Sequence, residues 1–94
     1  MNEQITLIAV TTEGDSFDCV TTKTAKTVFC AEESISQREF FEASAQGLKA
    51  ELKLKLWTQD YNGEQTAEYN GRHYHIYRTY KRFDMTEIYL ASEG

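Results

Sequence analysis

The sequence KAELKLKLW, from Lys49 to Trp57, alternates apolar and charged side chains without interruption before it ends on tryptophan. Consecutive side chains of a β-strand point to opposite faces of a sheet, so this stretch would bury one face and expose the other. One buried face and one solvated face are typical of antiparallel sheets. The residues expected to point inward are Ala50, Leu52, Leu54 and Leu56. The stretch therefore predicts a half-buried antiparallel strand.

Strand and turn signals lie on both sides of this stretch. The run 5–10 is rich in β-branched residues and is followed by a turn-forming composition. Asn70-Gly71 is the strongest two-residue hairpin signal of the chain. In the last apolar run, Ile88 and Leu90 are expected to point inward. The predicted strands cover residues 5–10, 26–32, 49–57, 65–69, 72–80 and 85–90.

The start of one helix is specified in detail. Ser36 followed by Glu39 is the pattern of a capping box. In such a box the Ser36 hydroxyl accepts from the Glu39 N–H, and the Glu39 carboxylate accepts from the Ser36 N–H. Gly47 supplies a residue suited to the left-handed conformation that ends many helices. We therefore expect one α-helix at about residues 37–46.

The segment 11–24 shows no sustained period of 2 or 3.6 residues and is rich in Thr, Ser and acidic side chains. Loops of about 12 residues or more without secondary structure are uncommon in compact domains and are often functional. We therefore expect a long loop at about residues 11–24, whose acidic part is a candidate contact with a neighbouring subunit or with a channel. The candidate residues are Glu13, Gly14, Asp15 and Asp18.

These elements amount to about six strands and one helix within 94 residues. A chain of that length builds one modest core, so we expect a single domain over residues 1–94. Antiparallel strands must hide their sheet edges, and curling into a small barrel does so at this length. The predicted fold is therefore mainly β, a small antiparallel β-barrel with one α-helix.

The formal net charge of −5 lies in the first half of the chain. Residues 1–48 carry three basic and eight acidic side chains, whereas residues 49–94 carry seven of each. A pI near 4.9 disfavours nucleic-acid binding by the whole domain. No stretch reaches the roughly 18 to 20 apolar residues of a membrane span, and the first residues lack a secretory signal pattern. We therefore expect no membrane partner, synthesis in the cytosol, and reduced thiols at Cys19 and Cys30.

The segment RHYHIYRTYKR, residues 72–82, carries four positive charges and no acid. With its tyrosines it has the chemistry for phosphate contact and base stacking on a small barrel. Alternating tyrosines also fit a pleated strand whose rings pack and whose hydroxyls stay in water, and this interpretation is the stronger one because it needs no nucleic acid. Both interpretations stay open. The candidate residues of this basic and aromatic strip are Arg72, Tyr74, Tyr77, Arg78, Tyr80, Lys81 and Arg82.

Catalysis has little support in this sequence. His73 and His75 are the only candidate bases near neutral pH, and no nucleophile motif such as GxSxG accompanies them. The same pair has alternate strand positions suited to zinc, but a zinc site needs further ligands, which only Cys19, Cys30 or the carboxylates of the predicted loop could supply. The five glycines are isolated, so a phosphate-cradling loop is not predicted. We expect no enzyme activity, no metal site and no cofactor.

Several segments resemble, in order and spacing, the head-tail joining proteins of long-tailed bacteriophages and prophages, which are also called head closure or stopper proteins. The resemblance begins at SQREFFEASAQGL, residues 36–48, a capped helix followed by Gly-Leu. It continues through DYNG at 60–63 and EYNGRHYHIYRTY at 68–80, and it ends at TEIYL, residues 86–90. It covers most of residues 24–90, and the part before them shares only a loose pattern of a strand and a polar loop.

The resemblance implies a structural role at the junction between phage head and tail. Such proteins form a ring beneath the portal and its adaptor, close the DNA exit channel of the filled head, and offer the surface to which the tail docks. The implied partners are copies of the same chain, an adaptor or portal-side connector, a tail-side joining protein, and the DNA that passes the channel. The implied location is the host cytoplasm during assembly and then the virion.

Two other interpretations stay open. The first is a free-standing β-barrel module that binds nucleic acid or a host protein, and the second is a neighbouring connector or tail-terminator protein. The charge of the first half of the chain also repels copies of the protein from one another at low salt. We therefore expect the isolated protein to be mainly a monomer or a weak oligomer.

Overall fold

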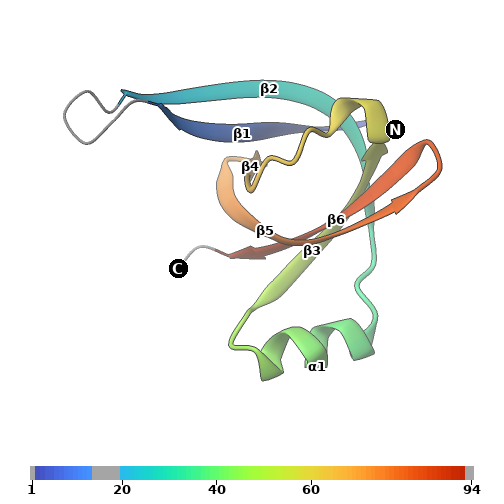
Figure 1. The fold of residues 1–94 in the computed structure, drawn as a ribbon. Helices are drawn as coiled ribbons and strands as arrows, with labels where there is room; N and C mark the ends of the chain where they lie inside the picture. Colours follow the sequence, from blue (N-terminus) through green and yellow to red (C-terminus); the bar gives the residue numbers. More distant parts are fainter. Residues whose placement is uncertain (1, 14–19, 93–94) are drawn as a thin grey trace.

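The structure, a computed structural model, describes residues 2–13 and 20–92, with side chains described for 2–10 and 23–92 (Figure 1). The described chain forms six strands, one α-helix and one short 3₁₀ helix. The elements are β1 (Glu3–Glu13), β2 (Val20–Glu33), α1 (Gln37–Ala45), β3 (Ala50–Trp57), η1 (Thr58–Asp60), β4 (Thr66–Tyr69), β5 (Arg72–Arg82) and β6 (Met85–Ser92).

The six strands form one antiparallel sheet that closes into a barrel in the order β1-β2-β3-β6-β5-β4. The ring closes where β1 meets β4, along a short seam. The pairs of that seam are Thr6–Glu68, Leu7–Ala67 and Ile8–Thr66. The predicted mainly-β fold, with about six antiparallel strands in a ring and one helix, is confirmed.

The core fills the inside of the ring with side chains from every strand. Leu54 of β3 lies directly opposite Ile88 of β6, and neither side chain is exposed. The alternation predicted for β3 is confirmed, although Leu52, near the start of the strand, is only partly buried. Leu90 of β6 points inward as expected. Burial of each large apolar side chain contributes roughly 1.5–3 kcal/mol, so these layers hold the ring together.

β1 and β2 continue past the barrel as a two-stranded ribbon, residues 9–13 and 20–24, on the left of Figure 1. The two strands pair with each other from Glu3–Cys30 to Glu13–Val20. The loop predicted over 11–24 is therefore wrong at both flanks, which are strand, and residues 14–19 lie outside the described chain. A ribbon beyond the barrel has no core to face, so its sequence needs no alternation. Its many β-branched threonines still favour extended backbone.

Two tight turns join the last three strands. Asn70 and Gly71 have φ values of 52° and 78°, as a two-residue hairpin turn requires, and the predicted hairpin is confirmed. β5 extends two residues beyond its predicted end, to Arg82, and turns into β6 through Phe83 and Asp84. Phe83 has a φ of 51°, a backbone conformation that bulky residues rarely adopt.

α1 lies outside the barrel, in the connection between β2 and β3 (Figure 1). The first half of the predicted cap is confirmed, because the Ser36 hydroxyl accepts from the Glu39 N–H at 3.2 Å. The second half is wrong, because the Glu39 carboxylate accepts from Tyr77 and Arg78 of β5 instead. Gly47 follows the helix with a φ of 78°, in the expected left-handed conformation. The Glu39 carboxylate, which the local pattern assigns to the helix cap, therefore forms a tertiary contact with β5 instead.

Replacing Ser36 by alanine is expected to lower the free energy of unfolding by about 1 kcal/mol, because the Glu39 N–H loses its hydrogen-bond acceptor. Urea denaturation of the purified variant measures the loss. Ser34→Ala, at an exposed residue outside the helix, is the matched control and should change stability little. Equal losses in the two variants would show that the cap contributes nothing specific.

Cys30 is a free thiol buried in the core with none of its surface exposed. Burial, and then the nearby Glu3 and Glu32 carboxylates, raise its pKa from 9.0 to about 11. The folded chain therefore holds this proton more tightly than the unfolded chain, so Cys30 makes stability fall as pH rises from 9 toward 11.

We expect Cys30 to resist alkylation by iodoacetamide near neutral pH, since both burial and the raised pKa disfavour the reactive thiolate. Mass spectrometry of a Cys19→Ser variant isolates this thiol. The same variant should be labelled rapidly once urea unfolds it. Rapid labelling of the native protein would contradict the expectation.

Candidate functional site

The basic and aromatic strip lies on β5, but a β-bulge divides it. The register with β6 shifts between Ile76 and Arg78, so Tyr77 has no directly opposed residue. Before the bulge, Tyr74 and Ile76 point into the core, and after it Arg78 lies opposite Tyr89 on the outer face. The extra residue changes which alternate positions face outward. The strip therefore separates into three groups instead of forming one face.

The first group, at the start of β5, does not form a surface site. Tyr74 is 5% exposed, so its ring is not free to stack on a base. Arg72 is exposed, but it lies six positions before Arg78 on the strand, a distance of about 20 Å. His73 and its neighbour Glu68 have side chains that are about half exposed and lie 3.9 Å apart. This end of the strand offers one isolated positive charge.

The second group anchors α1 to the barrel through Glu39, which is 8% exposed. Its Oε2 accepts from Arg78 Nη1 at 2.6 Å, and its Oε1 accepts from the Tyr77 hydroxyl at 3.1 Å. The Arg78 guanidinium also lies 5.5 Å from the ring centroid of Tyr89 and 3.8 Å from the carboxylate of Glu42. Burial and the bond to Glu39 raise the pKa of the Tyr77 hydroxyl. These side chains hold the helix, and the half-exposed Arg78 guanidinium is already engaged by Glu39.

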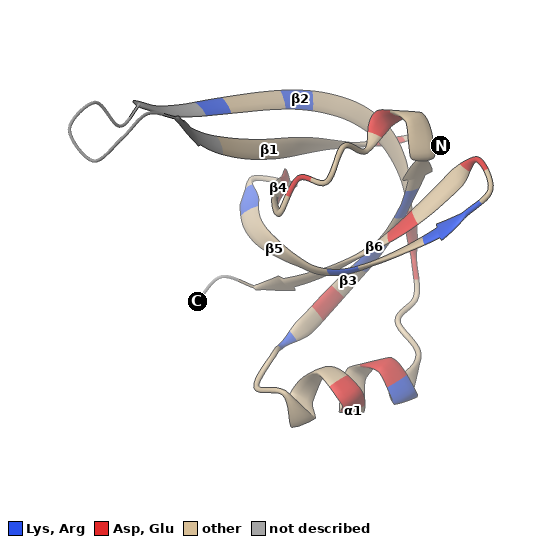
Figure 2. Ribbon diagram, in the orientation of Figure 1, with Lys and Arg blue, Asp and Glu red and all other residues tan. Residues whose placement is uncertain are grey.

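The third group forms the end of the β5–β6 hairpin, where Figure 2 shows basic residues on β5 close to its turn. Tyr80, Lys81 and Arg82 are exposed, and the Arg82 guanidinium lies 5.1 Å from the Tyr80 ring centroid. The turn adds Phe83, which is 96% exposed. Trp57 lines the same surface from the end of β3 and is 44% exposed. We call residues 80–84 the hairpin tip.

Thr58 fixes the hairpin tip in place from η1. Its backbone N–H donates to the Asp84 carbonyl at 2.7 Å. Its hydroxyl donates to the Phe83 carbonyl at 3.2 Å and shares a hydrogen bond of 2.9 Å with the buried Thr86 hydroxyl. The tip is therefore an ordered projection whose backbone is bonded to the body of the barrel.

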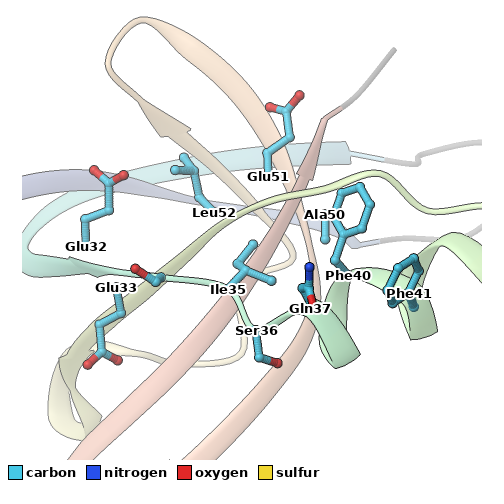
Figure 3. A pocket seen from close by; sticks show the side chains of 11 residues that line it. Glu32, Glu33, Ile35, Ser36, Gln37, Phe40, Phe41, Ala50, Glu51 and Leu52 are labelled. Atoms are coloured by element: carbon cyan, nitrogen blue, oxygen red, sulfur yellow. The ribbon is translucent and has the colours of Figure 1, made fainter.

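A groove of about 780 Å³ lies between α1, the segment that precedes it, and the start of β3 (Figure 3). Phe40 and Phe41 of α1 lie at one end of it, with 46% and 65% of their surfaces exposed. Glu32 and Glu33 lie at the other end, which makes that end acidic. Between and beside these ends it is lined by Ile35, Glu51 and Leu52. We call this space the α1 groove.

The acidic candidates of the first half of the chain fall at the edge of the described residues or beyond it. Glu13 is the last residue of β1, and Gly14, Asp15 and Asp18 lie outside the described residues. Within residues 2–13 and 20–92, no group of three or more His, Cys, Asp or Glu side chains is placed to hold a metal ion. In the same residues, no helix has the length and apolar character needed to cross a membrane.

Of the aromatic residues on the two surfaces, sequence reasoning named Tyr80 as a site candidate and missed Trp57, Phe83, Phe40 and Phe41, although each carries a signal. Phe83 stands in a turn, where Gly, Asn, Asp and Ser are the usual residues. Trp57 continues the alternation of β3 on the outer, lysine-bearing face. Phe40 and Phe41 are adjacent on a helix, so both cannot face the barrel. These signals locate exposed aromatic side chains but do not name what they bind.

Comparison of this chain with models of known protein families and with curated proteins finds no match. The sequence pattern and the geometry described above are therefore the basis for assigning a function.

Proposed function

We propose that this chain is a head-closure connector of a tailed bacteriophage or prophage. In this role it forms a ring at the head-tail junction, closes the DNA-filled head and offers the surface to which the tail docks. Its partners are copies of itself, a portal-side connector and a tail-side joining protein, first in the host cytoplasm and then in the virion. The role is structural and requires neither catalysis nor a cofactor. The order and spacing of the segments that resemble head-tail joining proteins support it.

The β1–β2 ribbon is the observation that carries this proposal. β1 pairs with β4 only at residues 6–8, and β2 pairs with β3 only at residues 30–33. Within the described chain, the ribbon strands beyond these points have no other strand beside them. Open strand edges pair with other chains unless they are protected. A barrel that already closes its own sheet gains nothing internal from such a projection, which suits contact with an adjacent subunit.

A free-standing nucleic-acid module has less support from the same structure. Base stacking and phosphate contact need aromatic and basic side chains on one exposed face. Here Tyr74 is buried, while Tyr77 and Arg78 are bonded to Glu39. The exposed remainder of the strip is the hairpin tip, Arg72 and the half-exposed Arg78, so it does not form one continuous face.

Deleting the gene from the phage or prophage that carries it tests the proposal. Electron microscopy of the lysate should show separate heads and tails, with few heads that retain DNA. Supplying the wild-type chain from a plasmid should restore joined particles. Joined particles at the normal number without the gene would overturn the proposal.

A shortened ribbon tests the observation that carries it. Replacing residues 10–23 by Asn-Gly joins Ala9 and Thr24, which are direct partners, by a two-residue turn and leaves the β1–β4 seam intact. This variant should fold but fail to restore joined particles. The matched control replaces residues 14–19 by Asn-Gly, which joins the partners Glu13 and Val20 and keeps the ribbon. Restoration by the control alone assigns the contact to the ribbon, whereas restoration by both variants shows that the ribbon is not an assembly element.

A further inference from the structure

Phe83 is unfavourable in the isolated chain in two independent ways. Its aromatic ring is 96% exposed to water, and its backbone has a φ of 51°, in the left-handed region that bulky residues avoid. The hydrogen bonds from Thr58 maintain this conformation. Strained residues that the surrounding structure holds in place cluster at binding sites. We therefore expect the exposed ring of Phe83 to bind a surface on another molecule.

The α1 groove has apolar walls and an acidic rim. The exposed rings of Phe40 and Phe41 supply the apolar part. Glu32, Glu33 and Glu51 line the groove, and none of the described residues that line it is a Lys or Arg. Among the described residues, Glu51 forms no ion pair with a basic side chain. A basic segment that carries an aromatic ring fits this lining.

The start of β3 adds backbone groups to the same groove. β2 pairs with β3 only from Lys53 onward, so residues 50–52 have no strand beside them on that edge in the part of the chain that the structure describes. Open edges of this kind accept hydrogen bonds from an incoming extended segment, in the manner of strand addition. The groove therefore offers polar backbone contacts as well as apolar and acidic side chains.

The hairpin tip matches the groove in charge. Lys81 and Arg82 are positive and Asp84 is negative, which gives the tip a net charge of +1, against three carboxylates in the groove. Lys81 has no ion pair among the described residues, and Arg82 lies 3.9 Å from Glu87 on its own hairpin. In the groove, Glu33 lies 3.9 Å from Lys53, and Glu32 accepts a hydrogen bond from the Tyr69 hydroxyl at 3.1 Å. The carboxylates of the groove are therefore only partly neutralised within one copy, and the positive charge of the tip can neutralise them further.

One copy cannot fill its own groove with its own tip. Trp57 lines the surface around the tip, and Leu52 lines the groove, and the two residues are five positions apart on β3. At about 3.3 Å per residue, these two lining residues are about 17 Å apart. The acidic end of the groove lies nearer to the tip, because Glu33 also lines a hollow with Arg82 and Phe83, but the phenylalanines of α1 lie at the other end of the groove (Figure 3). Thr58 holds the tip to the barrel end, so the tip does not swing across that distance. The partner must be another molecule.

We propose that the hairpin tip of one copy docks into the α1 groove of the next copy. Phe83 then lies against the phenylalanines of α1, and Lys81 and Arg82 face the acidic rim. Because the two surfaces differ, the contact is heterologous and repeats head to tail, which closes into a ring when the rotation per subunit allows it. The proposal rests on the proposed ring function and names a contact between its subunits. A contact of this small size is weak in isolation, in keeping with a chain expected to be mainly monomeric.

Backbone NMR spectra of the labelled chain over a concentration series test the contact directly, because they detect even weak association. Signals from the hairpin tip and from the α1 groove should both shift as concentration rises. Phe83→Asn is expected to weaken the association at least tenfold and to leave thermal stability unchanged or raised, since Asn tolerates the left-handed conformation. Phe29→Asn, which removes another exposed aromatic ring from β2, is the matched control and should leave the shifts in place.

A complementary pair of variants tests whether the contact is heterologous. The tip variant carries Phe83→Asn and Lys81→Glu, and the groove variant carries Phe41→Ala and Glu51→Lys. Neither should associate alone, because each lacks one half of the contact. The mixture should form a one-to-one dimer, because the tip variant keeps an intact groove and the groove variant keeps an intact tip. The signals that shift should therefore be the groove signals of the tip variant and the tip signals of the groove variant. Association of either variant alone, or no shift in the mixture, would overturn the proposal.

Two further outcomes separate this inference from the proposed function. If the wild-type chain shows no concentration-dependent shift at the tip and groove up to its solubility limit, the tip-to-groove contact is wrong. Tip signals that shift on addition of a short DNA duplex, but not with protein concentration, would also reject it in favour of nucleic acid. In either case, failure of the gene deletion to separate heads from tails remains the independent result that rejects the connector function itself.

Discussion

Replacing Leu54 by alanine is expected to lower the free energy of unfolding by about 3 kcal/mol, within the range measured for buried Leu→Ala changes. Leu54 has no exposed surface and lies directly opposite Ile88, so the lost methyl groups leave a cavity at the centre of the barrel. Domains of this size have total stabilities of roughly 5–15 kcal/mol, so the loss is a large fraction of the whole. Urea denaturation monitored by Trp57 fluorescence measures it.

Leu52→Ala is the matched control, because it makes the same chemical change two residues earlier on the same face of β3. Leu52 is only partly buried, so its loss should be clearly smaller than that of Leu54. A double variant, Leu54→Ala with Ile88→Ala, should cost less than the sum of the two single changes, since both enlarge one cavity. Equal losses at Leu52 and Leu54 would contradict the described core.

Replacing Glu39 by alanine is expected to cost about 2 kcal/mol, because a largely buried carboxylate that accepts two hydrogen bonds is removed. The change leaves the Tyr77 hydroxyl and Arg78 without their acceptor, and α1 loses its bonds to β5. The half-exposed Arg78 regains water, which limits the loss. Glu39→Gln keeps an oxygen for Tyr77 and should cost less.

Glu42→Ala is the control on the same helix, since Glu42 is about half exposed and its ion pairs with Arg38 and Arg78 are worth little. A second measurement follows the Tyr77 hydroxyl by ultraviolet titration. Glu39 contributes to the raised pKa of Tyr77, so Glu39→Ala should lower that pKa while burial keeps it above the ordinary value. An unchanged tyrosine titration in Glu39→Ala would contradict the described anchor.

The sequence predicts the barrel well wherever one face of a strand is buried. The alternation of β3 and the Asn70-Gly71 turn are local sequence patterns, and the structure has the strand and the turn that they predict. The strands predicted at 5–10 and 26–32 are too short, and the loop predicted at 11–24 is too long, because alternation is a signal of burial and the β1–β2 ribbon extends past the core. The threonines of the ribbon favour extended backbone, but they do not indicate which strand pairs with them.

The candidate site was less predictable because its contacts join residues far apart in the chain. Glu39 fits a capping box by local pattern, yet Tyr77 and Arg78, nearly 40 positions away, take its carboxylate. The strip on β5 is continuous in sequence, but the extra residue at Tyr77 rotates the later positions onto another face. A bulge has no residue signature in this strand, so spacing alone could not show that the strip divides.

The seam between β1 and β4 has a consequence for how the chain folds. It consists of three residue pairs, and Thr6 and its partner Glu68 are 62 positions apart. The hairpins β1–β2, β4–β5 and β5–β6 join strands that are neighbours in sequence, so they form with little loss of chain entropy. The seam instead closes a loop of nearly two thirds of the chain, which costs more entropy and is slower. Ring closure is therefore a late event on the folding pathway. Until it occurs, a newly made chain is an open sheet whose β1 and β4 edges are both free to meet the wrong partner.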